Sequence, residues 1–135
     1  MKRYLLFLCA VISALVSNSF GVSAQTLAEA ESYMEQGGEM FTAGKYEEAV
    51  DLFAKAAEIH KSISGEMDME YSTAILNIGV ACTSLGDFET AAAFISKAAE
   101  IRKVIIGEED ERYINVLANL GVLYYNMGKF PESLG

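Results

Sequence analysis

Residues 55–71 read KAAEIHKSISGEMDMEY, and residues 97–113 read KAAEIRKVIIGEEDERY. The two stretches agree at most positions and lie 42 residues apart, without insertion or deletion. The same interval separates three further sets of residues: Gly44, Gly86 and Gly128; Gly37, Gly79 and Gly121; and Tyr46, Phe88 and Phe130. Self-similarity at a fixed period of about 20 to 50 residues is the signature of a repeat protein. The sequence therefore predicts an array of equivalent units.

Within each unit, apolar residues recur with the period of an α-helix. A stripe with steps of four and three residues marks one helix face: Tyr71, Ile75, Ile78, Cys82 and Leu85, repeated 42 residues later as Tyr113, Leu117, Leu120, Tyr124 and Met127. A second helix of the unit carries Phe88, Ala91, Ala92, Ile95, Ala98, Ala99 and Ile105. Its alanines allow close helix–helix approach. We expect glycine turns at Gly86 and Gly128 inside units, and at Gly65 and Gly107 between units.

The units are therefore predicted to be helical hairpins. One hairpin cannot bury its apolar face alone, so neighbouring hairpins must stack into an all-α solenoid. Asp68 and Asp110 stand where an N-cap or first-turn acid belongs. The first unit departs from the pattern, because its equivalent stripe is partly polar: Glu29, Tyr33, Gln36, Met40 and Ala43. Terminal repeats are atypical in this way, so residues 26–43 are predicted to form an N-terminal capping helix.

The start of the chain has the pattern of a secretory signal peptide. Lys2 and Arg3 precede the apolar run YLLFLCAVISALV at residues 4–16, and small residues, Val22 and Ala24, precede a cleavage position. The run is shorter than the roughly 20 apolar residues of a membrane-spanning helix, which argues against the alternative of an uncleaved anchor. We predict a signal peptide at residues 1–24, cleavage after Ala24, and export of residues 25–135 to a periplasm or out of the cell.

The last residues, YNMGKFPESLG at 125–135, align with residues 83–93. Pro131 would then lie in the first turn of a second helix, where a missing backbone N–H costs little. We expect about 2.5 repeats, with the last one truncated.

The stretches ILNIGVACTSLGDFETAAAFISKA (75–98) and VLANLGVLYYNMGKFPES (116–133) resemble the tetratricopeptide repeat. Its signature positions are Gly79, Gly86, Phe88, Ala91 and Ala98, and one unit earlier Gly37, Gly44, Tyr46, Ala49 and Ala56. The period of 42 exceeds the usual period of about 34 residues, and Lys61 and Lys103 stand where the family has proline. In this the chain is similar to the kinesin light chain subtype, which also occurs in bacterial multi-domain proteins beside a caspase-like protease domain or a sensor kinase.

The resemblance implies a right-handed superhelix whose concave groove, lined by the first helix of each unit, holds a peptide or partner segment. Asn77 and Asn119 lie on that face, where an amide can both donate to and accept from an extended backbone. The alternatives are that they stabilise the packing of adjacent first helices or face water. A companion set of groove residues is Asn115, Val122, Tyr125 and Asn126, with Thr73, Val80, Thr83 and Ser84 one unit earlier.

Some relatives bind acidic C-terminal tails through basic groove residues. The corresponding positions hold no lysine or arginine: Glu31, Met34, Glu35, Gly38, Thr73, Leu76, Asn77 and Val80. The resemblance therefore argues against an acidic tail as ligand and favours a neutral, apolar or basic one.

Charge and reactive residues narrow the function further. Removing Lys2 and Arg3 from the ten basic residues leaves eight against nineteen acidic ones, a formal charge of −11. This argues against nucleic acid, whose binding needs lysine and arginine, and against membrane association once the signal is removed. His60 is the only histidine and is predicted to lie on the surface, without a metal or cofactor. Cys82, on the apolar stripe, is predicted to be a buried hydrophobe without a disulfide partner.

No catalytic set can be assembled around one histidine, so we do not expect an enzyme. The sequence predicts an exported interaction module that binds a peptide or protein segment in its groove. The alternative is the N-terminal sensor or scaffold part of a larger multi-domain protein, with a protease or kinase domain beyond this chain. An exposed last hairpin would also allow self-association.

Overall fold

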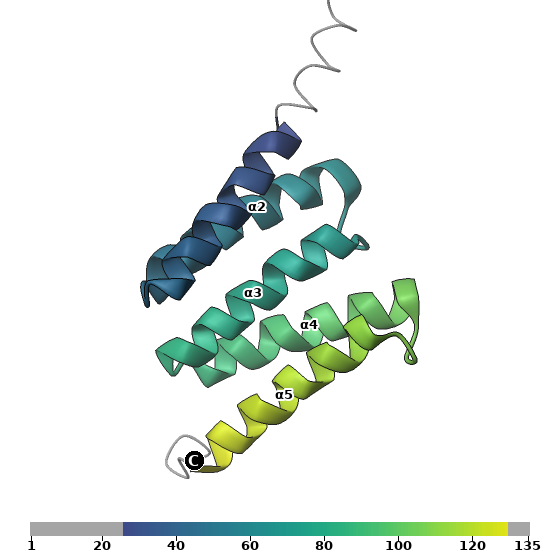
Figure 1. Ribbon diagram of the computed structural model, residues 1–135. Coiled ribbons are helices and arrows are strands. Elements are labelled where there is room, and N and C mark those ends of the chain that lie inside the picture. Colours follow the sequence, from purple (N-terminus) through teal and green to yellow (C-terminus); the bar gives the residue numbers. More distant parts are fainter. Residues whose placement is uncertain (1–25, 130–135) are drawn as a thin grey trace, which may run out of the picture.

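The computed structural model describes residues 26–129 (Figure 1). The predicted signal peptide and the predicted helix start at Phe130 and Pro131 lie outside the described residues. The described part contains a helix over residues 26–42, followed by four more helices: α2 (Tyr46–Ser64), α3 (Met69–Leu85), α4 (Phe88–Ile106) and α5 (Glu111–Lys129). These residues include no strand, which confirms the all-α class. No helix among them is both long and apolar enough to span a bilayer.

The helices stack in chain order as hairpins. The helix over residues 26–42, α3 and α5 run parallel to one another in Figure 1, with α2 and α4 behind them; we call the first three the leading helices and the other two the trailing helices. α3 packs against both α2 and α4, and α4 also packs against α5. Each hairpin therefore buries its apolar face against the next one, and the predicted solenoid is confirmed.

Glycine turns end the helices where the repeat predicted them. Gly44, Gly65, Gly86 and Gly107 have φ between 79° and 86°, a conformation that costs glycine little. The Gly86 N–H donates to the carbonyl oxygens of Cys82 and Thr83, closing α3. The prediction of a glycine turn at Gly128 is wrong, because α5 continues through this residue to Lys129. The residues that would hold the next turn lie beyond the described part.

Asp68 and Asp110 begin helices as predicted. The Asp68 carboxylate accepts a hydrogen bond from the Tyr71 N–H at 2.9 Å, one of the donors left free at a helix start. Asp110 accepts from the Arg112 N–H at 2.8 Å, and both of its oxygens accept from the Arg112 guanidinium, at 3.0 and 2.9 Å. These bonds, the side-chain bonds first, lower the pKa of Asp110 from 3.8 to about 2.

The small residues of the repeat let leading and trailing helices approach closely. Ala49, Ala56, Ala91 and Ala98 are completely buried. A Cβ atom added at Gly79 would lie 2.5 Å from Cγ1 of Ile95, and one added at Gly37 would lie 2.5 Å from the Phe53 ring. These positions have no room for a larger residue.

The predicted apolar stripe is buried in α3 but not throughout. Tyr71, Ile75, Ile78 and Cys82 are all at most 6% exposed. Leu85, the last residue of the stripe, is 43% exposed, so its placement on the buried face was wrong, because it lies in the last turn of α3 next to the Gly86 turn. Ile105, near the end of α4, is 40% exposed. In α5, Leu117 and Tyr124 are 43% and 57% exposed. Within the described residues, α5 packs against α4 and, to a lesser extent, α3, and no helix there covers Leu117 and Tyr124.

Candidate functional site

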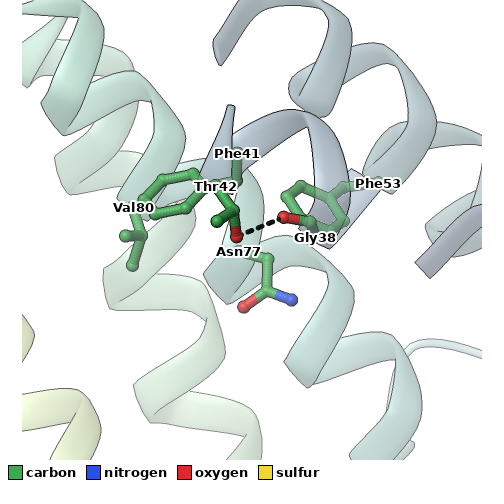
Figure 2. Close-up of a pocket in the computed structure, with 6 residues that line it drawn as sticks. All are labelled: Gly38, Phe41, Thr42, Phe53, Asn77 and Val80. Carbon is green, nitrogen blue, oxygen red and sulfur yellow. Dashed lines mark hydrogen bonds between the residues drawn. The ribbon is translucent and has the colours of Figure 1, made fainter. Parts of the chain in front are cut away.

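A cavity of about 270 Å³ lies between the first two leading helices (Figure 2). Helix 26–42, α2 and α3 all contribute to its lining: Gly38, Phe41, Thr42, Phe53, Asn77 and Val80. The two aromatic rings and Val80 give it apolar walls. In Figure 2 the Asn77 side chain points away from Thr42 and Gly38.

A second cavity, of about 310 Å³, lies between α3 and α5. Its lining is Val80, Thr83, Ser84, Ile95, Asn119, Val122 and Asn126. Adding 42 to each residue number of the first lining gives six of these seven residues. Val80 belongs to both linings, so the cavities adjoin. The fold thus presents one site twice, in successive units along the leading helices.

The amide groups of the two cavities retain bonding capacity. Among residues 26–129 the Asn77 side chain has no hydrogen-bond partner, whereas Nδ2 of Asn119 donates to the carbonyl oxygen of Asn115 at 3.1 Å. An asparagine amide offers two donors and an acceptor oxygen. Oδ1 of Asn119 and one of its N–H groups therefore stay available, as does the whole amide of Asn77.

The hydroxyl groups in the cavities donate to their own helices. Thr42 Oγ1 donates to the Gly38 carbonyl at 2.9 Å (Figure 2), and Thr83 Oγ1 donates to the Gly79 carbonyl at 3.0 Å. Their oxygen lone pairs remain as acceptors. Neither lining contains a charged residue. The cavities therefore offer apolar walls with neutral donors and acceptors.

Not every predicted groove residue lines these cavities. Asn77 and Val80 line the first cavity. The second brings together the other predicted groove residues that line a cavity, along with Val80: Thr83, Ser84, Asn119, Val122 and Asn126. Asn115 and Tyr125 are exposed on α5 outside both linings. Thr73 is half-buried, and its hydroxyl accepts a hydrogen bond from Nη2 of Arg102 at 2.9 Å, which gives it a structural partner.

Arg102 has a structural role that its sequence position did not predict. The Arg102 side chain, 7% exposed, reaches from α4 to two hydroxyls of α3 and to the start of α5. Besides its bond to Thr73, its Nε donates to Ser72 Oγ at 3.1 Å, and its Nη1 donates to the Arg112 carbonyl at 3.0 Å. Burial, followed by the nearby Arg112 charge, lowers the pKa of the Arg102 guanidinium. The guanidinium ties three helices together.

The prediction that His60 lies on the surface is wrong. His60 is 7% exposed, on the side of α2 that also buries Phe53, Ala56 and Ala57. The spacing of 53, 56, 57 and 60 is helical and would have shown this. Cys82, by contrast, is buried as predicted, and burial, with Asp87 nearby, raises the pKa of its thiol. Residues 26–129 contain no cluster of three or more histidine, cysteine or acidic side chains placed to hold a metal ion.

The stacked helical hairpins, with one uncharged cavity repeated along their leading helices, define an α-solenoid. Comparison with known proteins gives the family: a family model described as tetratricopeptide repeat matches residues 70–135, and a second with the same description matches residues 40–66. Together the two ranges cover more than half of the 135 residues. The chain belongs to the tetratricopeptide repeat family, whose members generally mediate protein–protein interactions.

Solved structures carry the same fold. The crystal structure of BtubC (BKLC) from P. vanneervenii matches with a TM-score of 0.69 and 24% sequence identity. The match covers 77% of this chain and 41% of that chain. At this identity the likeness supports the solenoid fold alone. No curated protein sequence matches the chain.

Proposed function

We propose that the chain binds an extended peptide or protein segment along the concave face formed by its leading helices. The observation that carries the proposal is the recurrence of one cavity at an interval of 42 residues, with Asn77 in the first copy and Asn119 in the second. An extended chain offers backbone N–H and C=O groups at regular spacing, with side chains on alternate faces. A repeated amide beside a repeated cavity matches such a ligand.

The chemistry of the cavities indicates the kind of segment. Phe41, Phe53 and Ile95 provide apolar walls, and burial of apolar side chains supplies most of the affinity in such contacts. No basic side chain is present in either lining to pair with a carboxylate, and the chain as a whole carries a formal charge of −9. We propose a neutral or basic segment with apolar side chains, rather than an acidic tail.

We further propose that the protein acts outside the cytoplasm. The support is the sequence of residues 1–24, with its basic start, apolar run and small residues before the cleavage position. Expression in a secreting host, followed by N-terminal sequencing of the exported protein, tests this. We expect a mature start at Gln25; retention of the full chain in the cytoplasm would contradict it.

The groove proposal is tested by selecting binding peptides from a displayed random library and measuring their affinity by calorimetry. The double variant Asn77→Ala/Asn119→Ala should bind the selected peptides about tenfold or more weakly, because it removes at least two hydrogen bonds of about 1 kcal/mol each.

The control is Glu58→Gln/Glu100→Gln, a pair that is also one unit apart but exposed on the trailing helices. This variant should keep the affinity, and both variants should keep the helical circular dichroism of the wild type. Equal affinities of the wild type and the asparagine variant would contradict the proposed site.

A further inference from the structure

A third cavity, of about 390 Å³, lies toward the other end of helix 26–42. Helix 26–42, α2 and α3 line it with Leu27, Glu31, Met34, His60 and Glu70. It shares no residue with either groove cavity. Its volume falls in the range of about 300 to 1,000 Å³ typical of small-ligand sites.

His60 is the buried polar residue of this lining. Although it is only 7% exposed, the structure gives its ring no hydrogen bond within residues 26–129. In the described part, no completely buried side-chain nitrogen or oxygen lacks a partner. The ring nitrogens of His60 must therefore reach open space, and the cavity that His60 lines provides it. A neutral imidazole presents one acceptor nitrogen there.

The next unit shows what fills the equivalent place. His60 corresponds to Arg102 at the 42-residue interval, and the Arg102 guanidinium lies against Ser72, Thr73 and the Arg112 carbonyl. In the first unit these three positions are Ala30, Glu31 and Glu70. Histidine is shorter than arginine, so the space that a guanidinium occupies in the second unit is left open in the first.

The charge of the residues around this cavity also differs between the two units. The second unit has a hydroxyl at Thr73 and a cation at Arg112, whereas the first unit has the exposed carboxylates of Glu31 and Glu70 at these positions. We propose that this cavity binds the guanidinium group of a ligand, in the place that Arg102 takes in the second unit. The site is distinct from the groove and does not depend on the proposed function.

The lining suits a guanidinium better than a simple ammonium. The planar guanidinium fork can donate to two carboxylates and to the imidazole acceptor together. Leu27 and Met34 provide apolar surface for the methylene stem of an arginine side chain. Because both carboxylates are exposed, added salt should weaken the interaction.

His60 is the only histidine of the chain, so its ring gives a unique NMR signal in the purified full-length protein. We expect ethylguanidinium chloride to shift this signal and the Met34 methyl signal saturably, whereas urea and sodium chloride at matched concentration do not. Glu31→Gln/Glu70→Gln should weaken binding about tenfold. Glu35→Gln/Glu39→Gln removes the same charge from exposed positions outside the lining and should leave binding unchanged.

His60→Arg should fill the cavity from within and abolish the Met34 response, with the fold retained as it is around Arg102. The same titration with N-acetyl-arginine amide and with an arginine-containing tripeptide distinguishes the source of the guanidinium. Tighter binding of the tripeptide indicates a polypeptide partner and equal binding indicates a free compound; both support the site. Shifts that sodium chloride reproduces, or an affinity unaffected by Glu31→Gln/Glu70→Gln, would overturn it.

Discussion

Replacing Gly79 with alanine would place a Cβ atom 2.5 Å from Cγ1 of Ile95 and 3.3 Å from the Ala91 carbonyl oxygen. Ile95 is 1% exposed, so its side chain cannot retreat without disturbing the core. Overpacking of this severity costs up to about 3 kcal/mol, while alanine in a helix is favoured over glycine by about 1 kcal/mol. We expect Gly79→Ala to lower the free energy of unfolding by about 2 kcal/mol.

The repeat supplies a matched control. Gly121 occupies the equivalent position in α5, and a Cβ atom added there meets nothing within 4 Å. Gly121→Ala should therefore gain only the helix propensity and raise the free energy of unfolding by up to about 1 kcal/mol. The same chemical change is thus expected to have opposite effects on stability at these two glycines, because among residues 26–129 a trailing helix packs on Gly79 and none packs on Gly121.

Urea unfolding followed by far-UV circular dichroism measures both variants. The expected separation of about 3 kcal/mol corresponds to more than about 10 °C in midpoint temperature for a domain of this size. If Gly79→Ala proves as stable as the wild type, or Gly121→Ala as destabilised as Gly79→Ala, the account of helix packing is wrong.

Three further predictions concern single side chains. Replacing Arg102 with leucine removes three hydrogen bonds and should cost about 2 kcal/mol in urea unfolding; a variant as stable as the wild type would refute the structural role of the guanidinium. The lowered pKa of Asp110, about 2 against an ordinary 3.8, means that its stabilising contribution is complete above about pH 4 and is lost as the pH falls through about 2. An NMR titration of its carboxyl carbon should show that midpoint and an increase toward the ordinary value in Arg112→Ala, whereas a midpoint near the ordinary value in both proteins would contradict the assignment. Cys82, buried and with a raised pKa, should react with iodoacetamide at pH 8 only as fast as the protein unfolds in a Cys9→Ser background; rapid labelling of the native protein would contradict its burial.

Most of the architecture could be predicted because the same local patterns, glycine turns and apolar helix faces, occur in successive repeats. The glycines at 44, 65, 86 and 107 mark turns, and the stripe from Tyr71 to Cys82 gives the buried face of α3. Each of these depends on residues close together in the sequence. The stripe failed at Leu85 because periodicity does not show where the neighbouring helix ends.

Side-chain contacts between helices could not be predicted from these local patterns. Arg102 bonds to Ser72 and Thr73, about thirty residues away, through a geometry that only the packed hairpins create. His60 was predicted to lie on the surface because it is near the end of a helix and has no second ligand nearby in the sequence, although its spacing from Phe53 is that of one helix face. The 42-residue repeat pairs His60 with Arg102, and this substitution between equivalent positions was the signal in the sequence that the two sites differ.

The candidate groove was predicted in outline only. The sequence placed Asn77 and Asn119 on one face, but not the cavities beside them, whose walls include Phe53 and Ile95 from the trailing helices. It also assigned to the groove Thr73, whose hydroxyl is hydrogen-bonded to Arg102. The sequence of a leading helix does not show which side chains of a trailing helix will line the cavity beside it.

The central claim, that a partner segment lies along the leading helices, is tested most directly by NMR. A selected peptide is titrated into the labelled protein while the side-chain amide signals of Asn77 and Asn119 are followed. We predict that both signals shift together and saturate with the same midpoint, since one extended ligand crosses both cavities. Saturable binding that leaves these two amides unchanged and shifts residues of α2 and α4 instead would contradict the claim.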